Sequence, residues 1–194
     1  MAIEQKRKRK YLTVLSGVNL HRQQWQKEGV SKPLYSQDTF NQDLERGGTD
    51  RSVDHKWSEA NTGGLQSGDV VYSQSSQTAS PVSDRHIGYV LSQNYLVLRP
   101  DKDLLDPNYL VFMINEEPWF RKELCSRFQG TALYRVSARD LESLEFPELP
   151  DLEIQKVIGQ IYLDQKKLTA LRKRVADNKE KLVLASLKGI GYEQ

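Results

Sequence analysis

The residues that could do chemistry in this chain do not add up to a catalytic set. Asp106-Pro107-Asn108-Tyr109 approaches the Asp/Asn-Pro-Pro-Tyr motif with which amino-methyltransferases hold a target base, but asparagine stands where the second proline belongs. No glycine-rich loop follows a strand upstream, as a nucleotide-like cofactor requires. We therefore interpret Asp106 as the cap of a helix that has proline in its first turn.

Two separate pieces, Pro150-Asp151 and Asp177-Asn178-Lys179, together resemble a nuclease motif. Both pieces lie on or at the edge of one predicted helix, about 40 Å apart, so they cannot share a metal ion within one chain. The three histidines, His21, His55 and His86, lack the spacing of metal ligands. A single cysteine cannot complete a zinc site. We predict no catalytic residue, no metal site and no cofactor.

Length and charge point to one ordinary domain with an appendage. The chain has 194 residues and a net charge of +2, and its basic residues cluster in Lys6–Lys10 and Arg172–Arg174. Cys125 is the single cysteine, which excludes an internal disulfide and fits the reducing cytoplasm. We expect Cys125 to be buried in a helix. No apolar run is long enough for a signal peptide or a membrane span, so we expect a cytoplasmic protein without membrane contact.

The strongest periodic pattern lies at the C-terminus. Apolar residues recur there at alternating steps of three and four, which is typical of a long helix that pairs with another helix. We call this helix the rod and the paired positions the seam. The seam residues are Ile154, Val157, Ile161, Asp164, Leu168, Leu171, Val175, Asn178, Leu182 and Ala185.

The polar seam positions Asp164 and Asn178 lower stability and fix register or orientation. From Asp151 to Lys188 the rod would span about 57 Å. A second apolar set, which includes Ile158, widens the stripe and suits docking against another surface. An alternative interpretation is a helix packed on its own head, with the two polar seam residues half exposed.

Residues 1–150 are predicted to form one mixed α+β domain, which we call the head, and residues 151–194 form the rod. Strands are predicted at 10–16, at 70–72 and within 88–99, and a short strand at 133–136. Helices should begin at Asp106-Pro107 and near Pro118. Residues 17–64 read as a long loop with short elements. Residues 73–83 are small and polar, which predicts an exposed loop.

Five short pieces, in order, resemble one half of a specificity subunit of type I restriction–modification enzymes. They end a strand, make a Gly-Asp turn, start a helix, form a Gly-Thr stretch, and lead into the spacer helix. They are Leu15-Ser16-Gly17, Leu65–Ser73, Leu105–Leu110, Gly130-Thr131 with Val136–Leu144, and Phe146–Gln155. The chain departs from the pattern by reading Leu149-Pro150 and Glu153-Ile154-Gln155 where the family has Pro-Pro and Glu-Gln.

Specificity subunits usually carry two target-recognition domains spaced by two long antiparallel helices, whereas this chain has one of each. The resemblance implies a non-catalytic protein that reads double-stranded DNA and directs a separate methyltransferase subunit, with a restriction subunit as a further partner. The missing half would come from a second copy. An antiparallel homodimer through the seam would read an inverted repeat. The S-adenosylmethionine belongs to the methyltransferase.

Loop composition alone indicates the residues that contact DNA, because phosphates attract Lys and Arg while base edges attract Arg, Gln, Asn, Ser and Thr. Three loops, 46–51, 73–86 and 127–135, have this composition. The predicted DNA-binding residues are Arg46, Arg51, Gln74, Ser75, Gln77, Arg85, His86, Arg127, Gln129, Thr131, Tyr134 and Arg135. A solvated loop remains the alternative for each.

Three other functions stay open at this point. The first is a coiled-coil homodimeric adaptor that binds proteins and has no DNA role, which predicts no salt-dependent DNA binding. The second is an enzyme with a hidden DNA-modifying site, such as a methyltransferase fragment, which predicts cofactor binding by the isolated chain. The third is a relic that acts only after recombination with another half.

Overall fold

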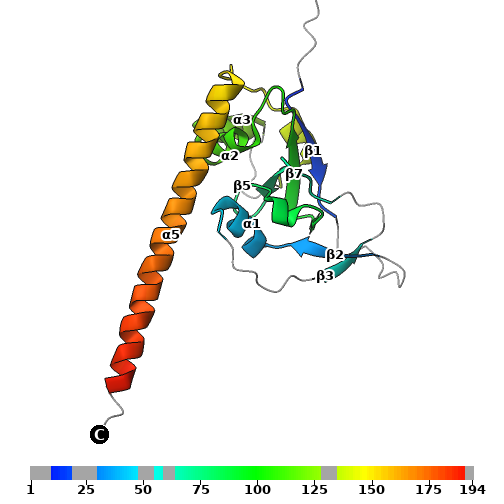
Figure 1. Cartoon of the computed structure of the whole chain (residues 1–194). Helices are drawn as coiled ribbons and strands as arrows, with labels where there is room; N and C mark the ends of the chain where they lie inside the picture. The colour runs from blue at the N-terminus through cyan, green and yellow to red at the C-terminus, as the bar shows by residue number, and fades with distance from the viewer. Residues whose placement is uncertain (1–9, 19–29, 48–54, 59–63, 128–134, 191–194) are drawn as a thin grey trace, which may run out of the picture.

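The computed structural model describes residues 10–18, 30–47, 55–58, 64–127 and 135–190. It consists of a head of mixed helix and sheet and one long helix, α5 (Leu152–Ile190), which leaves the head at one end and extends well beyond it (Figure 1). This arrangement confirms the α+β class with a long C-terminal helix.

Two small sheets form the frame of the head. The first has the order β1 (Leu12–Ser16), β7 (Tyr95–Pro100), β4 (Val70–Ser73) and β5 (Thr78–Pro81), and all its neighbours are antiparallel. The second has the order β3 (His55–Ser58), β2 (Val30–Tyr35) and β6 (Val90–Leu91), in which β2 is parallel to β6.

The central strands β4 and β7 are buried on both faces. Because side chains alternate across a strand, neighbouring residues point into different apolar clusters. Val70 and Leu98 point into one apolar cluster, which includes α2 (Pro107–Glu116) and Leu163 of α5. Val71 and Val97 point into a second cluster, which includes α1 (Gln37–Leu44). The first sheet is therefore the middle layer of the head.

Side-chain caps fix where the helices begin. Asp106 accepts hydrogen bonds from the amides of Asn108 at 2.9 Å and Tyr109 at 3.0 Å, and Pro107 occupies the first turn of α2. The helix α3 (Pro118–Arg127) follows. Ser137 caps α4 (Ala138–Glu142) in a reciprocal capping box. The predicted helix starts at Asp106-Pro107 and Pro118 are confirmed.

The prediction of an exposed loop over 73–83 is wrong in its second half. Thr78–Pro81 forms β5, and Ala79 and Ser80 are fully buried. The amide of Asn115 pairs with both the N–H and the C=O of Ala79, and Ser80 donates to the carbonyl of Phe40. Small residues are needed here because two helices approach the strand closely.

Residues 17–64 hold short elements, as expected: β2, β3 and the helix α1, whose cap is Ser36. One further expectation needs correction. Cys125 is exposed on α3, where we expected it to be buried. The first half of the predicted strand at 133–136 lies outside the described residues, and Arg135 and Val136 are not in a strand.

Candidate nucleic-acid interface

One buried glutamine joins the rod to the head. The Gln155 side chain is 1% exposed. It accepts from the amide of Asp106 at 3.0 Å and donates to the carbonyls of Leu104 at 3.3 Å and Pro150 at 2.8 Å. One side chain thus joins the loop before α2, the residue that precedes the rod, and the first turns of the rod itself.

The rod also lies against α2 at a distance that only glycine permits. A Cβ atom on Gly159 would come within 2.6 Å of the Tyr109 amide nitrogen and 2.7 Å of the Asn108 carbonyl carbon. Leu163 is fully buried one turn later. Ile158 and Tyr162 are partly buried against the same cluster. The second apolar set predicted from the sequence is therefore not one continuous docking surface. Its members at this end of the rod pack on the head.

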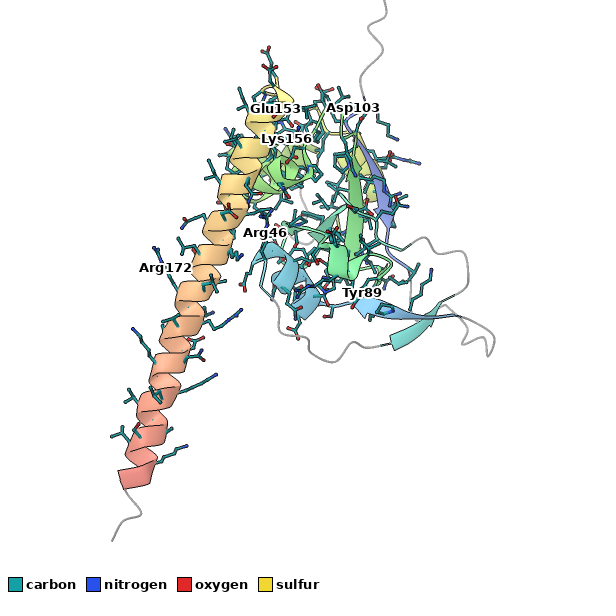
Figure 2. The ribbon with its side chains drawn as sticks, in the orientation of Figure 1. Arg46, Tyr89, Asp103, Glu153, Lys156 and Arg172 are labelled. Carbon is teal, nitrogen blue, oxygen red and sulfur yellow. The ribbon has the colours of Figure 1, made fainter. Side chains whose placement is uncertain are left out.

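Two polar contacts extend the junction. Tyr162 and Lys166 each donate to Glu116 Oε1 at 2.9 Å. Hydrogen bonding from Lys166 holds the pKa of the Glu116 carboxyl below its ordinary value, and the Tyr162 hydroxyl adds to the effect. On the other side Arg46 reaches Asp164 at 3.4 Å and Gln160 at 3.3 Å, and Figure 2 shows Arg46 between the head and the rod.

Most of the seam lies on a face of the rod that the head does not cover, although Asp164 accepts from Arg46 and Leu171 lines a groove with residues of the head. The seven large apolar residues of the seam, from Ile154 to Leu182, are 41–69% exposed. Asp164, Asn178 and Ala185 are exposed as well. The rod therefore does pack on its own head, but with a stripe that is largely distinct from the seam. This stripe of exposed apolar side chains remains available to a partner.

One predicted DNA-contact residue, Gln74, ties the turn between β4 and β5 to a distant segment. Gln74 donates to the carbonyl of Val136 at 2.6 Å and accepts from its amide at 3.1 Å, so this glutamine fixes a distant segment. Ser75 and Gln77 are exposed at the turn, and Gln77 adopts a positive φ of 53°. Arg135 is exposed and donates to the carbonyl of Gln93.

His86 belongs to a buried polar chain. Its Nδ1 lies 2.7 Å from Asp43 Oδ1, and the Tyr35 hydroxyl donates to Asp43 Oδ2 at 2.8 Å. Burial raises the pKa of Tyr35 well above its ordinary value, and the charge of Asp43 raises it further. These hydrogen-bonded side chains hold the 3-10 helix η1 (Asp84–His86) against α1. Its neighbour Arg85 is exposed.

A groove of about 960 Å³ runs between the head and the rod. Its lining includes Arg46, Arg85 and His86, which were predicted from composition, and Lys102 and Arg174, which were not. The available signal for Arg174 was its place in the basic run Arg172–Arg174. No local signal placed Lys102 beside that run.

The remaining predicted contacts cannot be located. Arg51, Gln129, Thr131 and Tyr134 lie outside the described residues, and Arg127 is placed only as the last residue of α3. Among the described residues, no group of three or more His, Cys, Asp or Glu side chains could hold a metal ion. Within the same ranges, no helix is long and apolar enough to cross a membrane.

A family model described as the type I restriction modification DNA specificity domain matches residues 24–177. The chain belongs to this family. The match includes most of the head and more than half of the rod, and it confirms the resemblance that the five sequence pieces indicated. No curated protein matches the sequence.

Two solved structures are similar to this chain, and the first of them shows its fold. A chain from a structure on complex assembly and conformational transition of the type I R-M system aligns with a TM-score of 0.59 and 19% identity, over 91% of this chain and 41% of that one. The HsdS subunit from Thermoanaerobacter tengcongensis aligns with a TM-score of 0.45 and 22% identity, over 71% of this chain and 35% of that one. The chain thus spans less than half of either relative.

Proposed function

We propose that this chain is the DNA-recognition component of a type I restriction–modification system, with residues 1–150 as the target-recognition domain and residues 151–194 as the spacer. It is non-catalytic and directs a separate methyltransferase subunit, with which a restriction subunit also associates. The observation that carries the proposal is the match of residues 24–177 to the type I specificity-domain family, in a chain whose rod is fixed to the head and leaves its seam exposed.

We propose further that a second copy pairs with the seam in the antiparallel sense. In a parallel pair Asp164 would face Asp164 of the second copy, and like charges repel. In an antiparallel pair with Leu168 opposite Leu171, each of the ten seam residues faces another seam residue. The heads would then dock about 27 Å apart along the rod, on opposite sides of the two-fold axis.

An inverted repeat in DNA matches this two-fold arrangement. The proposed readers are the exposed residues Ser75, Gln77, Arg85 and Arg135, together with the predicted residues that lie outside the described ranges. Arg46 is half-buried and already bonds to Asp164 and Gln160 of the rod. Gln74 and His86 would act as supports, because their side chains already have internal partners.

The test is the mass of the whole protein in solution by light scattering. The pair Leu168→Asp with Val175→Asp should convert a dimer to a monomer, while the control pair Lys173→Asp with Ala176→Asp, on exposed positions outside the seam, should leave the dimer intact. Leu171 is avoided because it lines the groove. A monomeric wild type at tens of micromolar would refute the homodimer, and absence of salt-dependent DNA binding would refute the recognition role.

A coiled-coil adaptor that binds only proteins is the second candidate, and the same exposed seam favours it. It predicts the dimer without any affinity for DNA. Measuring duplex binding on the dimeric protein therefore separates the two functions.

A further inference from the structure

The groove between head and rod carries an excess of outward-facing positive charge. Four cationic side chains line it: Arg46, Arg85, Lys102 and Arg174. Arg85 and Arg174 have no ionic or hydrogen-bonding partner within the described part of the chain. Lys102 donates to the carbonyl of Ser67 at 3.0 Å and forms no ion pair there. At least three cations are therefore free to meet an anion from solution.

Four carboxylates also line the groove, but three of them face inward. Asp69 is 1% exposed and forms two bonds to Arg99, at 2.7 and 2.8 Å. Asp43 is 4% exposed and bonds to Tyr35 and His86. Asp106 accepts two backbone amides of α2. Asp84 is exposed, and it alone of the four opposes the cations from the surface.

The cations come from separate elements that the fold brings together. Arg85 is on η1, Lys102 follows β7, and Arg174 is on the rod. The Arg174 guanidinium reaches the head, because a Cβ atom on Gly47 would lie 3.3 Å from its Nη2. The neighbouring Arg172 does not line the groove and lies on the side of the rod away from the head (Figure 2).

We propose that this groove binds the phosphate backbone of DNA and that Arg174 of the rod is one of the contacts, an inference that rests on the proposed recognition function. Duplex DNA presents a phosphate about every 1.7 Å along its axis, so cations spread over a groove of this size can meet several phosphates. The rod would then supply affinity for DNA in addition to spacing the heads, and the contact would not depend on base sequence.

The experiment measures the affinity of the full-length protein for a fluorescent duplex of arbitrary sequence between 50 and 200 mM salt. Each phosphate contact contributes about 0.9 to the slope of log affinity against log salt. Arg174→Gln and Arg85→Gln should each lower that slope by about 0.9. The loss of affinity over the fourfold salt range then becomes about 3.5-fold smaller for each variant. The double variant should lower the slope by about 1.8, and Arg174→Lys should restore it.

Arg172→Gln is the matched control, since it removes the same charge from the same helix outside the groove. Circular dichroism and light scattering on every variant confirm fold and mass. Slopes for Arg174→Gln and Arg85→Gln that equal the Arg172→Gln slope would overturn the inference and leave the recognition function standing. A loss of binding to a methyltransferase subunit with an unchanged DNA slope would overturn it in favour of a protein partner. A wild type that binds no duplex would overturn both.

Discussion

Replacing Gly159 with alanine should destabilise the head, although alanine is the better helix former. In a free helix this change stabilises by about 1 kcal/mol. Here the new Cβ would lie 2.6 Å from the Tyr109 nitrogen, 2.7 Å from the Asn108 carbonyl carbon and 2.8 Å from Asn108 Cβ. These atoms are in or next to the α2 backbone, so none can rotate away, and α2 and the rod must separate.

Forcing an extra methyl group into a packed interior costs about 1–3 kcal/mol. The penalty here should exceed the propensity gain, because separating the helices also strains the bonds of Gln155 and the packing of Leu163. We expect the free energy of unfolding of the head to fall by up to about 2 kcal/mol after the propensity gain is subtracted. Gly159→Val should have a larger effect of the same sign.

Tryptophan fluorescence during urea unfolding isolates the head, because all three tryptophans precede residue 151. The midpoint should drop for Gly159→Ala while the helical signal at low urea is kept. Ala176→Gly, in the exposed part of the rod, is the control and should leave the fluorescence midpoint unchanged. A midpoint that rises for Gly159→Ala would show that helix propensity governs this position and that the close approach to α2 does not.

Three further predictions concern other parts of the molecule. Tyr35→Phe removes a donor from buried Asp43 and should lower the free energy of unfolding by about 2 kcal/mol at pH 7 in urea titrations. Because burial raises the Tyr35 pKa, its stabilising contribution is complete below pH ~10 and disappears as pH rises further, so wild type should lose its advantage over Tyr35→Phe in alkali. Gln155→Leu leaves the Asp106 amide and two carbonyls without their hydrogen-bond partner. It should therefore lower the melting temperature far more than Gln160→Leu does at an exposed position. Inserting seven residues into the outer half of the rod should move the heads of an antiparallel pair apart by about 10.5 Å. Selection from random duplexes should then show a preferred half-site spacing that is longer by about 3 base pairs. An unchanged spacing would exclude the rod as the spacer.

Local patterns were enough to predict the elements whose signals are contained within a few residues. The Asp106-Pro107 cap and the continuous apolar run of β7 need no distant partner to be recognised. The heptad pattern likewise predicted which face of the rod stays exposed. The strand β5 was missed because its small residues reflect the approach of α1 and α2, which the local sequence does not reveal.

The candidate site could be predicted less well than the fold, for a physical reason. Glutamine and histidine are suited to reading base edges and equally suited to internal bonds, so composition cannot distinguish the two uses. Gln74 bonds to Val136 and His86 to Asp43, pairings that span 62 and 43 residues. Arg174 reaches the head for a similar reason, because the placement of α2 against Gly159 sets the direction of the rod.

The outer part of the rod also has a consequence for the lifetime of the protein. From Val175 to Lys188 every side chain of α5 is exposed, and an isolated helix of that length is only marginally stable in water. A copy without a partner therefore frays there and presents an apolar, protease-accessible segment. Trimming of surplus copies at that segment would leave heads that can no longer pair. In the proposed homodimer, pairing would protect this segment, so the lifetime of each copy would depend on its partner.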